Sequence, residues 1–318
     1  MAVVDMPLEE LKLYQGKNPR PADFDQYWDK ALAEMNSVNP NPQITKADFK
    51  CSFADCFDMY FTSVNNAKVY AKLLKPKNKT KCPAILCFHG YTGASSPWID
   101  YLAYAAQGFV VAALDCRGQG GKSQDTTQTV GTTFRGHIIR GLDGLPENLA
   151  FRQIYLDTAM LAKIVAELDE VDENRMAAMG VSQGGGLTLA CAALVPGIKK
   201  AAPMFPFLCD YKRVWELDLG TDAYREIKDY FRQFDPQHKN EEQIFTKLGY
   251  IDIQHLAKRI KAEILIGVGL RDDICPPSTQ FAAYNKMKCI KQMLIYPDFS
   301  HEILPGFNDI AFQWISEI

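Results

Sequence analysis

The sequence predicts an α/β fold in which helices flank a mostly parallel central sheet. Two observations predict it. Short apolar runs of strand length recur along the chain, and segments with helical periodicity separate them. Several runs are apolar at every position, which is typical of parallel strands covered by helices on both faces. The runs lie at 82–88, 108–115, 176–181, 199–205, 263–270 and 291–296.

One domain is expected for residues 1–318, because 47% of them are hydrophobic and the length suits a large α/β domain. The formal charge of −3 gives no electrostatic basis for binding nucleic acid or an anionic membrane. No apolar run approaches the roughly 20 residues of a membrane-spanning helix. Residues 1–16 have no basic start and lack the layout of a secretory signal. We therefore expect neither nucleic-acid nor membrane partners.

Nine cysteines are scattered along the chain, and no Cys-x-x-Cys pair occurs. Several, such as Cys87 and Cys191, fall inside apolar strands or helices. Reduced, buried thiols in a cytoplasmic protein are therefore the expected arrangement. A zinc site needs clustered ligands, so no metal is predicted. No dinucleotide fingerprint follows the first strands of the sheet, so no nucleotide cofactor is predicted either.

The N-terminal segments are expected to surround the sheet. Residues 1–40 predict a peripheral extension with an amphipathic helix, because Phe24, Trp28 and Leu32 recur at helical spacing. Residues 43–75 contain alternating segments that predict antiparallel edge strands with a turn at 65–66. Further along, we expect helices at 98–107, 154–168, 278–286 and 307–318, a polar excursion over the sheet at 125–150, and a turn at 172–174.

Residues 207–260 differ from the sheet-forming segments on either side of them. They combine many aromatic residues with many charges, and they read as helices and loops inserted between two strands. An insertion at this point would lie above the edge of the sheet that carries the site and would shape the pocket. The alternative is a pair of surface helices that does not contact substrate.

The segment around Ser182 has the features of a nucleophile elbow. An apolar strand leads into Gly180-Val181-Ser182-Gln183-Gly184, and a helix rich in small residues follows. Such a turn strains the serine backbone, and its glycines are needed because strand and helix nearly touch. The pentapeptide alone would occur by chance in roughly one chain in ten of this length. Its position between a strand and a helix makes it much stronger evidence for a nucleophile.

Candidates for the base and the acid follow two later strands. Asp272 and Asp273 come after the strand that ends at Leu270, and His301 comes after the last strand. The order Ser, Asp, His is that of the α/β-hydrolases. Asp272 is favoured over Asp273 on spacing, and Asp298, a third candidate, is expected to cap or solvate the histidine loop.

Backbone amides are expected to stabilise the oxyanion of the tetrahedral intermediate. The strand at 82–88 opens into His89-Gly90, where α/β-hydrolases place one oxyanion loop. The amides of Tyr91 and Gln183 are the predicted donors, and His89 is expected to brace the loop. The remaining histidines, His137, His238 and His255, are expected to be ordinary surface residues.

Four motifs together resemble the acetyl xylan esterase and cephalosporin-C deacetylase group, carbohydrate esterase family 7. They are Arg117-Gly118-Gln119 with the two glycines that follow, the pentapeptide around Ser182, the segment 269–277, and His301-Glu302. The resemblance covers nearly the whole chain, including the extension and the insertion. The Arg-Gly-Gln and His-Glu motifs in this register are far more specific than Gly-x-Ser-x-Gly.

The resemblance implies an α/β-hydrolase that deacetylates small substrates, namely acetylated xylo-oligosaccharides and cephalosporin C. It implies an intracellular, metal-independent enzyme without a cofactor, usually a hexamer. By the motif match Ser182, Asp272 and His301 form the triad. Tyr91 and Gln183 supply the oxyanion donors, and Tyr91 also binds substrate. The residues expected to support the motifs and brace the loops are Arg117, Gln119 and Glu302.

Two other functions share these features. A serine peptidase of the prolyl-oligopeptidase type has the same triad order, although 318 residues leave no room for its propeller domain. A non-catalytic binding protein on a hydrolase scaffold would usually have lost a triad residue, and none is missing from this sequence.

Overall fold

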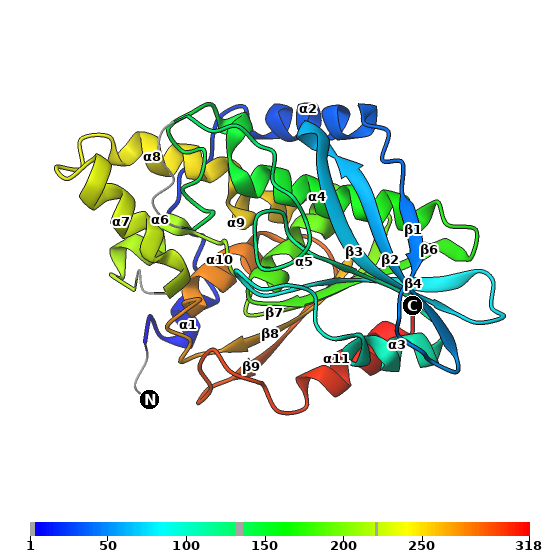
Figure 1. Cartoon of the computed structure of the whole chain (residues 1–318). Coiled ribbons are helices and arrows are strands. Elements are labelled where there is room, and N and C mark those ends of the chain that lie inside the picture. The colour runs from blue at the N-terminus through cyan, green and yellow to red at the C-terminus, as the bar shows by residue number, and fades with distance from the viewer. Residues whose placement is uncertain (1–3, 131–135, 220–221) are drawn as a thin grey trace.

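The computed structural model describes residues 4–130, 136–219 and 222–318, and a β-sheet forms its centre (Figure 1). Within these residues the sheet has nine strands in the order β1-β2-β3-β5-β4-β6-β7-β8-β9. The first three are antiparallel, and β3 also pairs antiparallel with β5. The other neighbours are parallel, as predicted. The strands are β1 (Gln43–Lys46), β2 (Ala54–Ser63), β3 (Ala67–Pro76), β4 (Cys82–Phe88), β5 (Val110–Leu114), β6 (Val171–Val181), β7 (Ile198–Met204), β8 (Glu263–Gly269) and β9 (Lys291–Tyr296).

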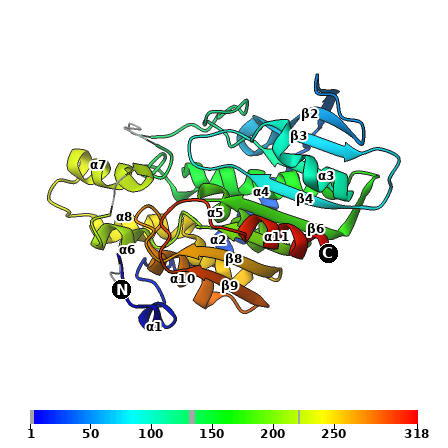
Figure 2. The ribbon, with the colours of Figure 1, turned by 90° about the horizontal axis from the view of Figure 1, so that it is seen from below.

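Helices cover both faces of the sheet. One face packs against α2 (Phe24–Ser37), α4 (Ala150–Ala166) and α5 (Gln183–Leu194), and the other packs against α3 (Leu102–Gln107) and α11 (Phe307–Ser316) (Figures 1 and 2). The helices expected at 98–107, 154–168, 278–286 and 307–318 are thus present with small shifts at their ends, the third as α10 (Pro277–Lys286).

The central strand β4 shows why these runs are apolar throughout. Leu86 and Phe88 belong to the apolar cluster on the side of α4 and α5. Their neighbours Ile85 and Cys87 belong to the cluster on the side of α3 and α11. Because successive side chains of a strand point to opposite faces, a strand between two helical layers needs apolar residues at every position.

The N-terminal extension forms part of the packed structure. It contains α1 (Leu8–Leu11) and α2, whose Phe24 and Trp28 side chains are fully buried. The Asp210 carboxylate ties the extension to the inserted segment, because it accepts hydrogen bonds from the Tyr14 hydroxyl and from the backbone N–H of Asn18. The extension therefore fixes the insertion as well as covering the sheet.

The segment predicted as an insertion follows β7 and precedes β8. It contains α6 (Tyr211–Glu216), α7 (Arg225–Phe234), α8 (Glu241–Leu248) and α9 (Ile253–Leu256), joined by loops and short 3-10 turns. Figure 1 shows α6, α7 and α8 grouped at one end of the molecule. The helical character expected for 207–260 is therefore present.

The turn predicted at 172–174 is wrong. Strand β6 begins at Val171, because Val171 pairs with Cys82 before a bulge shifts the register to Met176 opposite Ala84. The polar residues between them belong to an extended strand whose pairing is interrupted. A β-bulge of this kind leaves no periodic signal in a sequence.

The prediction that the remaining histidines are ordinary surface residues is wrong for His255 and His137. His255 is buried on α9, its ring packs edge-on against Phe24, and its Nε2 lies 3.2 Å from the carbonyl oxygen of Pro19. Burial lowers the pKa of His255 to about 3, so its ring is neutral. His137 is half-buried with its ring edge-on to Tyr91.

All nine cysteines lie in the described part of the chain and are free. Seven are buried, whereas Cys51 and Cys289 are partly exposed. Among the described residues, no helix combines the length and the apolar character that crossing a membrane requires.

Candidate active site

Ser182 lies in a strained turn between β6 and α5. Its backbone has φ 59° and ψ −118°, a conformation that L-residues rarely adopt. A Cβ atom on Gly180 would lie 2.5 Å from the carbonyl carbon of Gly184, and one on Gly184 would lie 2.1 Å from the carbonyl oxygen of Phe88. The two glycines are therefore required by close packing, and the turn exposes the serine at the end of its strand.

Asp272 and His301 form a hydrogen-bonded pair at the ends of β8 and β9. The Nδ1 atom of His301 lies 2.9 Å from Oδ2 of Asp272. Asp272 is fully buried, and its Oδ1 accepts hydrogen bonds from the backbone N–H groups of Ile274 and Cys275 at 3.0 and 2.8 Å. These contacts fix the carboxylate so that it holds the imidazole ring in one orientation.

The Cys275 thiol lies beside the Asp272–His301 pair. One side-chain atom of each of Asp272, Cys275 and His301 belongs to a group whose atoms all lie within 4.8 Å of one another. Burial raises the pKa of Cys275 well above its usual value, which keeps the sulfur protonated. Asp272 and His301 already bond each other through the two atoms that a metal ion would need. The donor chemistry therefore suits proton transfer better than metal binding.

The other acidic candidates have exposed side chains. Asp273 is exposed, and its Oδ1 accepts a hydrogen bond from the Ser300 hydroxyl at 3.3 Å. Asp298 is exposed as well. Glu302 accepts the backbone N–H of Ser300 at 3.1 Å, so it holds the loop that carries His301. The structure thus brings Asp272 to the histidine, and it gives Asp273 and Glu302 contacts within the loops.

Gln183 occupies the first position of α5, where backbone N–H groups have no acceptor within the helix. Its side chain is buried and pairs with Gln119 through two amide hydrogen bonds of 2.7 and 3.0 Å. The Gln183 Nε2 atom also lies 3.4 Å from the carbonyl oxygens of His89 and Gly90. Gln183 therefore joins the turn at Ser182 to the loop after β4.

His89 braces that loop, as the sequence predicted. Its Nε2 accepts the backbone N–H of Cys116 at 2.9 Å, and its Nδ1 lies 2.7 Å from the carbonyl oxygen of Gly90. Accepting at Nε2 places the proton of the neutral ring on Nδ1. Burial lowers the pKa of His89, so the neutral form is favoured.

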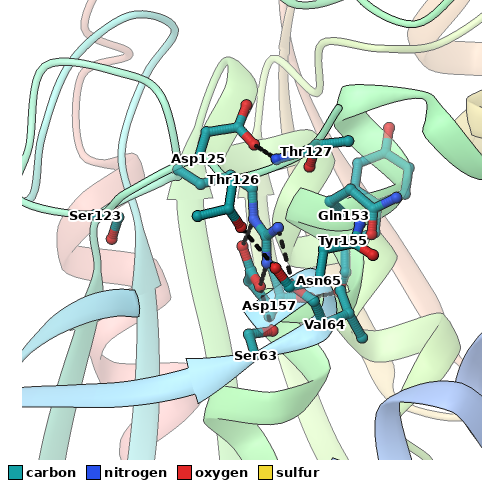
Figure 3. Close-up of polar contacts among 12 residues, drawn as sticks. Ser63, Val64, Asn65, Ser123, Asp125, Thr126, Thr127, Gln153, Tyr155 and Asp157 are labelled. Carbon is teal, nitrogen blue, oxygen red and sulfur yellow. Dashed lines mark hydrogen bonds and ion pairs between the residues drawn. The ribbon is translucent and has the colours of Figure 1, made fainter. Parts of the chain in front are cut away.

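Arg117 is buried beside the site and forms an ion pair with Asp157 of α4. Its Nε and Nη2 atoms donate to the two carboxylate oxygens at 2.7 and 2.5 Å. Its Nη1 donates to the carbonyl oxygen of Val64 at 3.3 Å, and the Ser63 hydroxyl donates to Asp157 (Figure 3). These bonds fix the start of the segment that carries Gln119. Arg117 and Gln119 therefore have the bracing contacts that the resemblance implied.

The Tyr91 hydroxyl is engaged by the inserted segment and by the loop at His137. It donates to Oε1 of Glu226 on α7 and accepts the backbone N–H of His137 at 2.7 Å. The part of Tyr91 in substrate binding stays a prediction.

Sequence reasoning missed Glu226. The signal that could have found it is helical spacing, because Glu226 lies on the same face of α7 as the buried residues Ile227 and Tyr230. An acidic residue inside an apolar stripe predicts a buried carboxyl group with specific partners.

A cavity of about 760 Å³ opens beside the turn at Ser182 and the loop after β4. It lies between α3 and α11 on one face of the sheet. Its walls include backbone of the turn at Ser182 and of the loop after β4. They also include aromatic rings and the acidic and amide side chains of Asp100, Asn308 and Asp309. The backbone and aromatic residues that contribute to the walls include His89, Gly90, Gly180, Val181, Tyr101, Tyr104 and Phe312.

Solved structures of two acetyl xylan esterases are similar to this chain along its length. Acetyl xylan esterase 1 from Thermoanaerobacterium sp. JW/SL YS485 is 55% identical with a TM-score of 0.97, over 98% of this chain and 99% of that chain. An acetyl xylan esterase from Paenibacillus sp. R4 is 34% identical with a TM-score of 0.94, over 98% of this chain and 99% of that chain. The acetyl esterase Axe7A of Xylanibacter ruminicola is 27% identical in an alignment of 318 positions. The alignment covers 97% of this chain and 69% of that protein.

More distant structures share the fold alone. An acylaminoacyl peptidase from Pyrococcus horikoshii is 18% identical with a TM-score of 0.57, over 84% of this chain and 41% of that chain. The fold is that of the α/β-hydrolases, as predicted. Identity this low gives no support to the peptidase alternative.

The family model described as acetyl xylan esterase (AXE1) matches residues 1–318, which is the whole of the sequence. The match includes the extension, the insertion and every segment that contributes to the site. The chain belongs to the acetyl xylan esterase family, whose members are carboxylic ester hydrolases.

Proposed function

We propose that this chain removes acetyl groups from acetylated xylo-oligosaccharides, with Ser182 as nucleophile, His301 as base and Asp272 as the orienting acid. The observation that carries the proposal is the 2.9 Å contact between the buried Asp272 carboxylate and His301, which follow the ends of β8 and β9 as Ser182 follows the end of the parallel strand β6. Family membership over the full chain supports the esterase chemistry.

The reaction begins at Ser182. Because His301 directs Nδ1 to Asp272, its Nε2 is left to accept the serine proton while Oγ bonds to the acetyl carbonyl carbon. The carbonyl oxygen becomes an oxyanion, and the amides of Tyr91 and Gln183 are the proposed donors to it. The imidazolium then gives its proton to the sugar oxygen as the ester bond breaks, which leaves an acetyl-enzyme.

Deacylation repeats these steps with water. The neutral imidazole of His301 takes a proton from the water, whose oxygen adds to the acetyl carbon. The second tetrahedral intermediate collapses when Ser182 Oγ leaves and takes the proton back from the imidazolium. Acetate departs, and the free serine is restored without any cofactor.

The cavity between α3 and α11 is the proposed place for the sugar part of the substrate, because its walls include Gly180 and Val181 next to Ser182, although no triad residue is among its lining residues. Tyr104 and Phe312 offer aromatic rings, and Asp100, Asn308 and Asp309 offer carboxylate and amide groups for sugar hydroxyls. Asp309→Ala should raise KM for acetylated xylo-oligosaccharides but leave the KM for p-nitrophenyl acetate unchanged. The exposed Gln313 on α11, which is not among the lining residues, provides the control variant Gln313→Ala.

The test of the proposal is Ser182→Ala with p-nitrophenyl acetate and acetylated xylo-oligosaccharides. We expect the loss of hydrolysis and of labelling by a fluorophosphonate probe, with an unchanged unfolding temperature. The exposed Ser52 provides the control Ser52→Ala, which should behave as the native protein. Near-normal turnover by the Ser182 variant would remove the basis of the mechanism.

We also propose, from the resemblance, that cephalosporin C is a second substrate and that the protein is a cytoplasmic hexamer. The nine free cysteines support a reducing compartment. Deacetylation rates on cephalosporin C, the mass of the assembly by light scattering and the fractionation of cells test these points separately.

A further inference from the structure

The buried carboxyl group of Glu226 links the inserted segment to the loop that carries Tyr91. Glu226 lies near the start of α7 and is 1% exposed. Its Oε1 accepts a hydrogen bond from the Tyr91 hydroxyl, and its Oε2 accepts one from the backbone N–H of Ile139 at 3.0 Å. Each carboxyl oxygen thus holds a different segment of the chain.

The surrounding backbone is shaped to admit this carboxyl group. A Cβ atom on Gly136 would lie 2.2 Å from Oε1 of Glu226, and Gly136 itself has φ +66°. Only glycine fits this position without displacing the carboxyl group. An apolar side chain on α7 could fill the same volume, but it could not orient the hydroxyl of Tyr91.

The ring of Tyr91 is held on its other sides as well. Its centroid lies 5.4 Å from that of Phe207, 6.3 Å from that of Phe151 and 5.9 Å from that of His137. Its hydroxyl accepts the backbone N–H of His137 at 2.7 Å. With the ring and hydroxyl fixed, the backbone of Tyr91 has little freedom left.

We propose that Glu226 is a positioning residue for acetyl transfer, which holds the Tyr91 amide where the oxyanion develops by anchoring the Tyr91 hydroxyl. The inference rests on the proposed function, since it needs that amide in the reaction. It also assigns a role to the insertion, whose helix α7 carries the anchor.

Three variants test the anchor. Tyr91→Phe removes the hydroxyl and keeps the amide, Glu226→Leu removes both acceptors, and Glu226→Gln keeps one. Loss of an oxyanion donor lowers kcat by roughly 10²–10³, so a misplaced donor should lower it by at least about tenfold. We expect that loss for Tyr91→Phe and Glu226→Leu, a smaller one for Glu226→Gln, and KM values within about threefold of the native value.

The double variant separates a shared role from independent ones. Because Glu226 acts through Tyr91, combining Tyr91→Phe with Glu226→Leu should lower kcat no further than the worse single variant. The inhibition constant of methylboronic acid, which forms a tetrahedral adduct with the serine, should rise in proportion to the loss of kcat/KM. Multiplicative losses, or unchanged boronate affinity, would contradict the anchor.

A correction for misfolded protein and a control variant show whether a loss of activity comes from the anchor or from another cause. Rates are divided by the fraction of Ser182 that a fluorophosphonate labels, so misfolded protein does not count. The exposed Glu242 on α8 provides the control Glu242→Gln, which should leave kcat unchanged. An active native enzyme whose Glu226 and Tyr91 variants retain full kcat would refute the inference and leave the proposed function standing.

Discussion

The loops that carry Asp272 and His301 are held by contacts within each loop and with each other, at most 29 positions apart, whereas the loop that carries Tyr91 is held from far along the chain. Asp272 accepts N–H groups from residues two and three positions away. Tyr91 bonds to a residue 135 positions away, and the nearby Gln119 bonds to one 64 positions away. The acid–base half of the site is therefore held over shorter stretches of sequence than the oxyanion half, which depends on segments from distant parts of the domain.

The comparison predicts that changes in the acid–base half affect chemistry without affecting folding. Asp272→Asn should lower kcat by about 10⁴, because the amide favours the wrong tautomer of His301. The adjacent Asp273 provides a matched control, and Asp273→Asn should change kcat by less than about twofold, as exposed substitutions do. Steady-state rates on p-nitrophenyl acetate and melting temperatures check both. Equal losses in the two variants would show that the acid assignment is wrong.

Changes in the oxyanion half should affect stability first. Removing one partner of a buried ion pair leaves an uncompensated charge, at a cost of about 3–5 kcal/mol. Arg117→Leu should therefore destabilise the protein by that amount, because both side chains of the pair with Asp157 are fully buried. Urea unfolding followed by fluorescence measures the change.

Removing both charges separates desolvation from packing. Arg117→Leu combined with Asp157→Leu should recover part of the lost stability, since no charge is then left unpaired. A double variant no more stable than Arg117→Leu would show that shape, rather than charge, keeps this pair in place.

The features that the sequence predicted have local signals, and the features that it missed depend on segments distant in the sequence. The strands of the sheet and the turn at Ser182 were predictable, because an apolar run followed by Gly-x-Ser-x-Gly is a local signal. The choice between Asp272 and Asp273 rested on spacing and family resemblance, and the hydrogen bonds of the folded loop now distinguish them. Glu226 and His255 were missed, because their burial depends on segments distant in the sequence. The start of β6 was missed because a bulge interrupts its pairing.

The pH dependence of stability provides a further test of the oxyanion half. Burial raises the pKa of Glu226 from its ordinary value of 4.5 to about 7. Between these values the folded state holds a proton that the unfolded state has released, so this group stabilises the fold below pH 4.5 and loses that contribution as pH rises through 7.

Glu226→Gln removes this proton uptake. Relative to the native protein, the variant should gain stability as pH rises from 5 to 7, by at most about 1.4 kcal/mol per pH unit. The residues with ionisable side chains that hydrogen-bond to Glu226 are Tyr91, through its hydroxyl, and His137, through its backbone. They are common to both proteins, so the difference in unfolding free energy isolates Glu226. A difference that stays constant with pH would show that the carboxyl group titrates normally.

The smallest expected effect belongs to Gln119, which is only half-buried. Gln119→Asn shortens the side chain by one methylene and breaks both amide bonds to Gln183, while water can reach part of the gap. The free energy of unfolding should fall by about 0.5–1.5 kcal/mol. If the bond also holds the backbone amide of Gln183 in position for the oxyanion, kcat should fall roughly two- to tenfold. Glu302→Gln is the matched control, because its amide oxygen can still accept the N–H of Ser300. If Gln119→Asn lost stability with kcat intact, Gln119 would support the loop without setting the position of the amide donor.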